Sequence, residues 1–460
     1  MRILPLIAAG LMAATPALAQ DLNAKSLEGG AAAIRDKALS DTLAWDVTES
    51  LTTEVGARMT GSPGMVVARD WAVAKFKALG FENIKVEAFK TPTWSRGAES
   101  AEVTAPTPHK LAILGLGSSD GGNVTAPIAL FRTYQAMLDQ PEGALAGKIA
   151  VVTEPMPKTQ DISGYAAVGL QRRSGALEAK KRGAVGYLVR SLSSDDTRLP
   201  HTGGGTASGI PAAALSPPDA ELLERLAARG KPVTVKLEMT SSRNPQSDAW
   251  NISGDIPGSG KGDEVIVIGG HLDSWDPGTG AIDDASGIGI TVAAAKLVAQ
   301  AGKPKRTIRV VMWGSEEQGG SSGAYATAHK AIIPKMVVAG ESDLGAGRIF
   351  SVAVPQVAVG HPAMKAFRAS LAPLKVVWLN SAPRAGGADI SGLMLQGVPF
   401  VDFNQDVQRY FDLHHSADDT LDKVDPQELA QNVAVWASFL YTVANSDVDF
   451  RPKPAATEAK

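Results

Sequence analysis

Histidines and carboxylates at the ends of expected strands are the residues of this chain that could do chemistry. His271 follows the strand-like run 264–270, and Asp283-Asp284 comes twelve residues later, at the start of an amphipathic segment. The later members of the set are Glu316, Glu317, Asp343 and His415. Two histidines with several carboxylates supply the nitrogen and oxygen donors of a two-metal hydrolytic site. The pattern therefore predicts metal-assisted hydrolysis.

The elements that must position these side chains alternate between strand and helix from residue 247 onward. The expected strands are 264–269, 307–313, 336–341 and 397–403. The expected helices are 287–300, 323–330, 362–369 and 426–445. This alternation indicates an α/β fold with a mixed, mostly parallel sheet and helices on both faces. Sites in such sheets lie beyond the carboxyl ends of the strands, so three strand ends would deliver these acids and His271 to one edge.

Each motif also has a purely structural interpretation. A lone histidine after a strand is more often structural, but the joint placement at three strand ends favours a site. Asp283-Asp284 could cap a helix; we expect Asp284 or Ser286 to cap it and Asp283 to bind metal. Neighbouring side chains diverge, so one glutamate of the pair 316–317 can bind metal while the other faces the substrate. In the pair 414–415, one histidine is an expected ligand and the other packs or contacts substrate.

The N-terminus has the pattern of a secretory signal peptide. Residues 1–2 give a short positive region, 3–12 are mostly apolar, and Ala17-Leu18-Ala19 is an A-x-A cleavage site. We therefore expect residues 1–19 to be removed and the protein to be exported, either to the periplasm or into the medium. The alternative, an N-terminal core helix, is disfavoured by the Ala-Ala-Thr-Pro-Ala stretch.

Composition divides the rest of the chain into four expected segments. Residues 20–106 form the N-terminal part of the catalytic domain, and 244–450 form its main part. Residues 107–243 contain helices and strands of their own without clustered acids and histidines, which predicts an inserted α/β domain. The Pro-, Ala-, Lys- and Glu-rich tail 451–460 is expected to be disordered.

The overall composition excludes several classes of function. The 460 residues are 44% hydrophobic and 20% charged, as in an ordinary globular protein. The net charge of −3 gives no basic surface for nucleic acid. No segment after the N-terminus reaches about 18 uninterrupted apolar residues, so no membrane span is expected. The chain has no cysteine, so a transition metal must be held by His, Asp and Glu. The oligomeric state stays open, a homodimer included.

The ordered set of motifs resembles the co-catalytic zinc exopeptidases, over roughly residues 40–445. The motifs are Gly270-His271-Leu272-Asp273-Ser274, Asp283-Asp284-Ala285-Ser286-Gly287, Glu316-Glu317-Gln318-Gly319, Glu341-Ser342-Asp343, and His415 followed by Asp419-Thr420. Longer strings are similar to the plasma glutamate carboxypeptidase (carboxypeptidase Q) branch, among them Trp275-Asp276 after the first motif, Gly387-Ala388-Asp389-Ile390, and Tyr410-Phe411 before His414. The resemblance implies a three-layer zinc-exopeptidase fold with an inserted domain similar to protease-associated domains.

The same resemblance implies a set of roles. His271 and Asp343 would hold one zinc ion, Glu317 and His415 the other, and Asp283 would bridge them, with a cis peptide bond to Asp284. Manganese or cobalt could occupy the same ligands. Glu316 would be the general base, and Asp273 would orient His271.

Four more residues are candidates for contact with a peptide substrate. They are His201, Asp389, Tyr410 and His414. His201 could instead be a turn residue, and Asp389 could support the site or bind a substrate amine. The Gly-rich stretches 203–205 and 319–323 depart from the family pattern, which puts the shape of the pocket in doubt.

The expected function is an exported zinc exopeptidase that hydrolyses dipeptides and short peptides with free termini. One alternative is a broad aminopeptidase that releases N-terminal residues. An alternative of another class is a non-catalytic protein that binds metal and peptide, which the presence of Glu316 disfavours.

Overall fold

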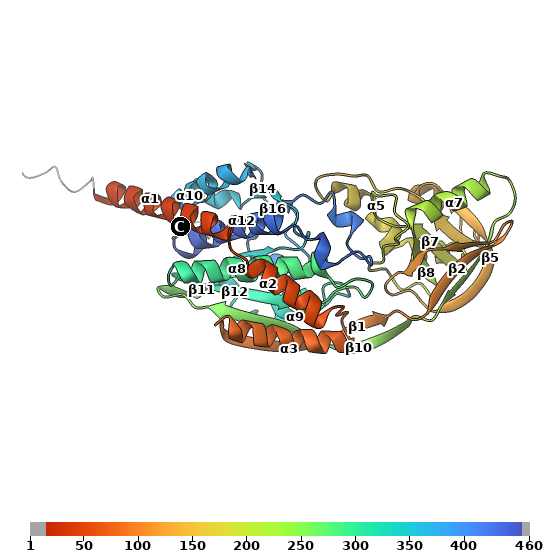
Figure 1. The fold of residues 1–460 in the computed structure, drawn as a ribbon, viewed down its shortest axis with the longest axis horizontal. Helices are drawn as coiled ribbons and strands as arrows, with labels where there is room; N and C mark the ends of the chain where they lie inside the picture. The colour runs from red at the N-terminus through yellow and green to blue at the C-terminus, as the bar shows by residue number, and fades with distance from the viewer. Residues whose placement is uncertain (1–14, 453–460) are drawn as a thin grey trace, which may run out of the picture.

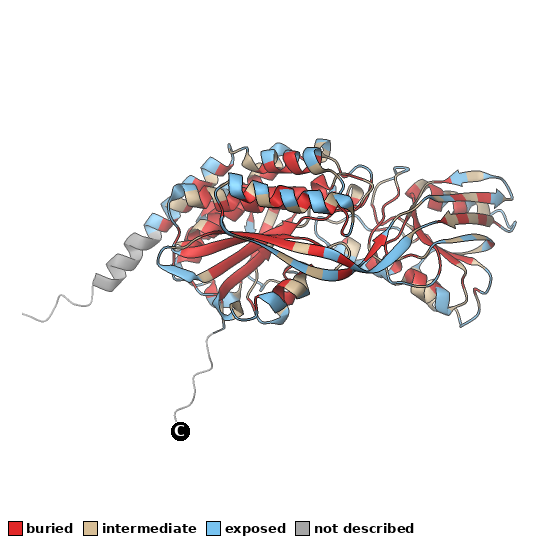
Figure 2. Ribbon diagram, turned by 90° about the horizontal axis from the view of Figure 1, so that it is seen from below, coloured by how far each residue is buried: buried red, intermediate tan, exposed pale blue. Residues whose placement is uncertain are grey.

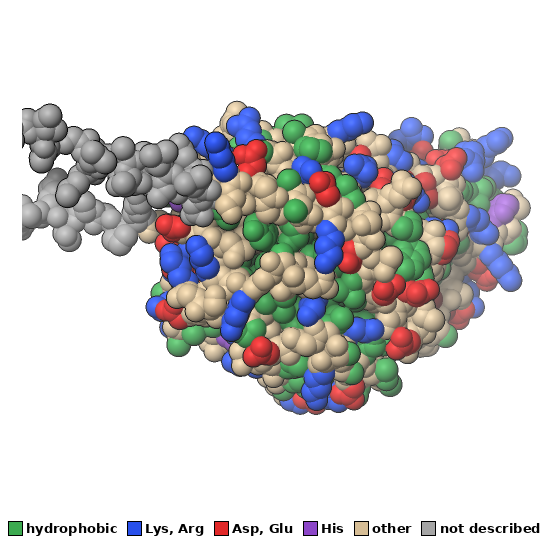
Figure 3. Space-filling model, turned by 60° about the vertical axis from the view of Figure 1, so that its left-hand side comes forward, with side chains coloured by type: hydrophobic (Ala, Val, Ile, Leu, Met, Phe, Trp, Pro, Cys, Tyr) green, Lys and Arg blue, Asp and Glu red, His purple; other side chains and the backbone are tan. Residues whose placement is uncertain are grey.

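The computed structural model describes residues 15–452, with side chains from residue 25 onward. Most of the expected signal peptide 1–19 and nearly all of the expected tail 451–460 lie outside the described residues. The chain forms a larger part rich in helices and a smaller part rich in strands (Figure 1). Acidic and basic side chains are interspersed over the face that Figure 3 shows. No helix of the described part combines the length and apolarity that a bilayer crossing needs.

The larger part is built on a five-stranded sheet in the order β1-β10-β12-β11-β13. Its strands are β1 (Glu82–Ser95), β10 (Ser242–Ile256), β11 (Lys261–His271), β12 (Arg306–Trp313) and β13 (Met336–Glu341). β11 pairs in parallel with both β12 and β13, whereas β10 pairs antiparallel with β1 and β12. Every residue of β12 is buried, as expected for a central strand covered on both faces (Figure 2). The mixed, mostly parallel sheet expected from the sequence is confirmed for this core.

Helices cover both faces of the sheet because its side chains alternate between two apolar cores. One core includes Ile266, Ile268 and Ile308 and packs against helices on one face; the other includes Val265 and Val267 and packs against the opposite layer. The first layer contains α1 (Thr15–Ala38), α2 (Leu43–Ser50), α3 (Pro63–Ala78), α8 (Ser286–Ala301), α10 (Pro362–Leu371) and α12 (Pro426–Ala444). The second contains α9 (Ser321–Ala328) and α11 (Ser391–Leu395).

The fourth expected strand, 397–403, does not form as one continuous strand. Next to β13 the chain makes an isolated parallel bridge between Ala339 and Phe400, and then enters β16 (Asp402–Gln405). β16 belongs to a separate three-stranded sheet with β14 (Ile349–Ala353) and β15 (Val377–Trp378). Pro399 has no N–H to donate, so the pairing with β13 cannot extend through it.

The smaller part contains an eight-stranded sheet in the order β3-β2-β9-β5-β6-β7-β8-β4. Its strands are β2 (Glu99–Ala105), β3 (His109–Leu111), β4 (Ile113–Gly115), β5 (Gly122–Phe131), β6 (Ile149–Val152), β7 (Gly186–Arg190), β8 (Ala212–Leu215) and β9 (Thr234–Met239). Its helices are α4 (Tyr134–Leu138), α5 (Ser163–Arg173), α6 (Gly175–Lys181) and α7 (Pro217–Ala227). It has two apolar clusters of its own. We call this part the insert.

The eight-stranded sheet begins earlier than the expected boundary at residue 107. β2 already pairs antiparallel with β9, so Glu99–Ala105 belongs to the sheet of the insert. The long antiparallel pair β1 and β10 joins the two parts, because the chain leaves along one strand and returns along the other. The alternating sequence pattern of β2 would fit either the five-stranded or the eight-stranded sheet. Its pairing with β9, which is distant in sequence, places it in the eight-stranded sheet.

A buried arginine fixes the loop that follows His271. Arg58 is fully buried, and its guanidinium donates hydrogen bonds to the carbonyl oxygens of Leu272, Thr279 (2.6 Å) and Gly280 (2.9 Å). Burial lowers the pKa of Arg58 to about 10, against the opposing effect of Asp419. The side chain thus links loop 272–280 to the N-terminal part of the fold.

We expect Arg58→Met to lower the free energy of unfolding by about 3 kcal/mol, because several buried carbonyl oxygens would lose their donor. Chemical denaturation of the two proteins measures the difference. Arg225→Met is the matched control, since Arg225 is exposed and its ion pair with Glu221 is long, at 3.6 Å. Its effect should stay within about 0.5 kcal/mol. Equal losses in the two variants would contradict the role given to Arg58.

Candidate metal centre

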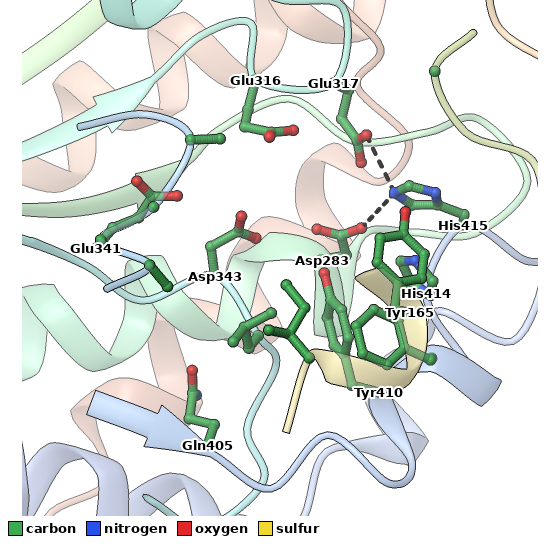
Figure 4. A pocket seen from close by; sticks show the side chains of 18 of the residues that line it. Tyr165, Asp283, Glu316, Glu317, Glu341, Asp343, Gln405, Tyr410, His414 and His415 are labelled. Atoms are coloured by element: carbon green, nitrogen blue, oxygen red, sulfur yellow. Dashed lines mark ion pairs between the residues drawn. The ribbon is translucent and has the colours of Figure 1, made fainter. Parts of the chain in front are cut away.

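The carboxylate of Asp283 lies between two histidine side chains. Its Oδ1 is 2.9 Å from Nε2 of His271. Its Oδ2 is 3.1 Å from Nε2 of His415, an ion pair that Figure 4 marks with a dashed line. A second carboxylate flanks each imidazole: Asp343 Oδ1 is 3.2 Å from His271 Nε2, and Glu317 Oε2 is 3.2 Å from His415 Nε2. The structure therefore brings all five expected metal ligands together, with Asp283 in the middle.

These side chains fit divalent metal ions. Glu317 Oε1 is buried without a hydrogen-bond partner among the described residues. Asp283 Oδ2 and Asp343 Oδ1 are buried too, and beyond the imidazole contacts just given they have no partner in that part of the chain. One donor atom from each of His271, Asp283 and Glu317 lies within 4.8 Å of the others. Buried carboxylates are costly unless they are paired or coordinate a metal. Imidazole nitrogen and carboxylate oxygen suit zinc and the neighbouring transition metals.

Three separate strand ends and one helix start deliver four of these groups, and the fifth, His415, lies on a loop. His271 ends β11, Glu317 lies in the loop after β12, and Asp343 follows β13. Asp283 precedes α8, which approaches β13 closely: a Cβ on Gly287 would overlap the carbonyl oxygen of Ser342. The convergence at one sheet edge is the one expected from the sequence.

Asp284 also lies close to His271 and Asp343, but its oxygens are already engaged. They accept the backbone N–H groups of His271 and Gly287, each at 3.0 Å. Asp284 thus caps the start of α8, while the Ser286 hydroxyl donates to the backbone further back. The peptide bond between Asp283 and Asp284 is cis.

Glu316 and Glu317 point to different parts of the same cavity (Figure 4). Glu317 turns toward His415, and its Oε2 accepts a hydrogen bond from the indole of Trp275. Glu316 makes no ion pair within the described residues. Burial, followed by the charge of Glu317, raises the pKa of Glu316 to about 8. The two neighbours therefore divide as expected, with one beside an imidazole and one free to handle a proton.

Asp273 contacts His271 mainly through its main chain. Its Oδ1 lies 3.6 Å from His271 Nδ1, which is too far for a hydrogen bond. The backbone carbonyl of Asp273 accepts from Nδ1 instead, at 2.8 Å. The carboxylate accepts the backbone N–H of Glu316 (2.9 Å) and the hydroxyl of Thr60 (2.7 Å). Asp273 thus holds His271 through its main chain and Glu316 through its side chain.

Two of the four expected substrate contacts line the cavity, whose volume is about 660 Å³. Tyr410 and His414 lie in its wall, with their rings stacked at 4.8 Å. His201 and Asp389 are buried behind the wall. His201 Nδ1 contacts the carbonyl oxygen of His414 at 2.8 Å, and Asp389 accepts the Ser321 hydroxyl at 2.8 Å. Both therefore support neighbouring segments where the sequence predicted substrate contact.

Other wall residues were missed from the sequence. Glu341 is the last residue of β13, so its place before Asp343 was an available signal. Tyr165 and Arg172 belong to α5 of the insert, and no sequence pattern placed them there. They reach the cavity because the insert packs on the loop of His415, where Thr202 N–H donates to the His415 carbonyl at 2.9 Å.

Known proteins match both the sequence and this geometry. The sequence model of peptidase family M28 matches residues 251–440. Carboxypeptidase Q of Mus musculus is 36% identical over 406 residues, covering 86% of this chain and 84% of the relative. The crystal structure of a peptidase M28 precursor from Shewanella amazonensis SB2B is 40% identical, covers 95% of this chain and 99% of its own, and superposes with a TM-score of 0.89.

The chain belongs to peptidase family M28. Membership in M28 makes it a metallo-exopeptidase and sets aside the non-catalytic alternative. A zinc aminopeptidase from Bacillus subtilis shares the M28 fold at 16% identity, with a TM-score of 0.64 over 88% of this chain and 95% of its own. The five expected metal ligands and Glu316 all lie within residues 251–440, the range that the M28 family model matches.

Metal uptake should release protons. In the metal-free site, burial raises the pKa of Glu317 and of Asp343 to about 7. Burial lowers the pKa of His271 and His415, but nearby carboxylates outweigh it and raise both well above the usual value. Protons therefore compete with the metal below about pH 7, and affinity should rise as the pH rises from 5 to 8.

Titration calorimetry with zinc at pH 6, in buffers of different ionisation enthalpy, measures this release. We expect at least one proton to leave per metal bound, and fewer in Glu317→Gln. Zinc binding of equal affinity at pH 5 and pH 8, without proton release, would contradict the assignment of these groups as ligands.

Proposed function

We propose that the protein is an exported zinc exopeptidase that cleaves dipeptides and short peptides with free termini. The observation that carries the proposal is the Asp283 carboxylate, with one oxygen toward each imidazole, at the wall of a cavity that also contains Glu316. Similarity to carboxypeptidase Q over most of the chain supports the choice of substrate class. The N-terminal sequence pattern of residues 1–19 supports export.

We assign two zinc ions to the five ligands. His271 and Asp343 would hold one, Glu317 and His415 the other, and Asp283 would be shared between them. Metal ions at such a site lower the pKa of a water molecule and polarise the scissile carbonyl group. Manganese or cobalt would fit the same nitrogen and oxygen donors.

Glu316 is the proposed general base. As a carboxylate it takes a proton from the attacking water, and then gives that proton to the leaving amine. Metal ions bound beside Glu316 would favour its ionised form and oppose the rise in pKa that burial causes. Asp273 keeps the glutamate in place through the 2.9 Å hydrogen bond to its backbone N–H.

Glu341 is the proposed partner of the free amino group of the substrate. Its Oε2 accepts the backbone N–H groups of Asp389 (2.8 Å) and Ile390 (3.1 Å). Its Oε1 is buried without a partner among the described residues. The carboxylate points into the cavity on the side of Asp343 (Figure 4). A substrate ammonium group would complete this half-satisfied acid, a task that the sequence suggested for Asp389.

A broad aminopeptidase is the second candidate. Leucine aminopeptidase 2 of Arthroderma otae is 30% identical over 269 residues, 57% of this chain and 49% of the relative. Rates on Leu-Gly, acetyl-Leu-Gly and leucine p-nitroanilide separate the two. The proposal expects fast cleavage of the free dipeptide alone; rapid cleavage of the anilide would favour the aminopeptidase. Good cleavage of the acetylated substrate would contradict both.

We expect Glu316→Gln to lower kcat by about 1,000-fold or more, because the amide cannot accept the proton. Metal content measured by mass spectrometry should stay at the wild-type level, since Glu316 is outside the proposed ligand set. Retained turnover, or loss of metal in this variant, would remove Glu316 from the role of base.

Glu341→Gln should lower kcat/KM for free dipeptides by about 10- to 100-fold, mainly through KM, because an ammonium group would lose its charged partner. Asp389→Asn is the matched control, since its carboxylate lies behind the wall; its effect should be several-fold smaller. Steady-state kinetics on Leu-Gly measures both. A larger loss of kcat/KM in Asp389→Asn than in Glu341→Gln would indicate that Asp389, and not Glu341, binds the substrate amine.

A further inference from the structure

A buried arginine of the insert lines the cavity beside His415. Arg172 lies near the end of α5, and only 7% of it is exposed. Its Nη1 is 3.2 Å from His415 Nδ1, and its guanidinium lies 5.3 Å from the centre of the Tyr165 ring. The Gly203 backbone packs against the guanidinium so closely that a Cβ there would overlap it. The position of this side chain is therefore tightly defined.

Within the side chains that the structure describes, residues 25–452, no counter-ion neutralises the charge of Arg172. No carboxylate of the described residues forms an ion pair with it, and its Nε has no hydrogen-bond partner. Two of the three other buried arginines pair with an acid: Arg309 with Asp255 at 2.7 Å and Arg306 with Glu264 at 2.7 Å. The third, Arg58, is satisfied by backbone carbonyl oxygens. Burying a guanidinium without an anion is costly, so the site is complete only when an anion enters the cavity.

The location of Arg172 identifies which part of a substrate would supply the anion. Glu341 and His415 lie at opposite ends of the cavity, with Asp343 and Asp283 between them (Figure 4). Arg172 adjoins His415, so it lies at the end away from Glu341. With the substrate ammonium at Glu341 and the scissile bond near Asp283, the next group along the chain reaches Arg172.

We propose that Arg172 binds the α-carboxylate of the residue that follows the scissile bond, and thereby selects dipeptides. The proposal rests on the proposed peptidase function and adds a specificity-determining residue to it. A guanidinium fork matches a carboxylate with two parallel hydrogen bonds. In a longer peptide a neutral amide occupies this place and leaves the arginine charge unpaired. The insert thus supplies the recognition of the C-terminus.

The test compares Leu-Gly with its C-terminal amide, Leu-Gly-NH₂, in the zinc-loaded enzyme. For the wild type we expect kcat/KM to favour the free acid by about 100-fold, because a site built for a polar partner rejects the analogue that lacks it. In Arg172→Met this ratio should fall to near 1, and in Arg172→Lys it should be intermediate. Zinc content is measured in parallel, because Arg172 also contacts His415.

Arg173→Met is the matched control, since Arg173 is the next residue of α5 and is exposed at the same cavity. It should keep most of the preference for the free acid. A wild-type enzyme that cleaves both substrates equally would overturn the inference while leaving the peptidase function intact. So would an Arg172→Met enzyme that loses both activities in parallel with its ratio unchanged. Failure to cleave either substrate, or any other peptide, would instead refute the proposed function.

Discussion

The placement of one carboxylate between two imidazoles is the constraint on which the rest of the site depends. Asp283 faces His271 with one oxygen and His415 with the other, at about 3 Å in each case. Holding three polar side chains this close in a buried place needs rigid support. Asp284 provides it by accepting backbone N–H groups from His271 and Gly287. The start of α8 and the end of β11 are thereby tied to each other directly beneath the site.

The two histidines depend on different parts of the molecule. His271 belongs to the central sheet and is held by the main chain of Asp273. His415 lies on a loop with a positive φ of 59° and is held by the insert: Thr202 N–H donates to the His415 carbonyl at 2.9 Å, and the Thr202 carbonyl lies 3.3 Å from His415 Nδ1. The insert is therefore part of the centre as well as a cover over it. The β1–β10 pair joins the two parts, so it must hold them in a fixed relative position for both halves of the site to meet.

The sequence was sufficient for the parts of the site that follow from local rules. Runs of apolar residues predicted the strands β11, β12 and β13. Acids or histidines that directly follow parallel strands must meet at one edge of the sheet. The division of Glu316 and Glu317 followed from the divergence of neighbouring side chains. Contacts set by packing between distant segments could not be predicted in this way. Thus β2 joined the insert through β9, and Arg172 reached the cavity from α5. His201 and Asp389 support the wall from behind.

The central claim is that Asp283 joins two metal sites, one at each histidine. X-ray diffraction from zinc-loaded crystals, with data collected on both sides of the zinc absorption edge, tests it directly. We predict two anomalous peaks about 3.5–4 Å apart, one between His271 and Asp343 and one between Glu317 and His415, with Asp283 contacting both. A single peak at full zinc occupancy, or peaks that Asp283 does not contact, would contradict the account.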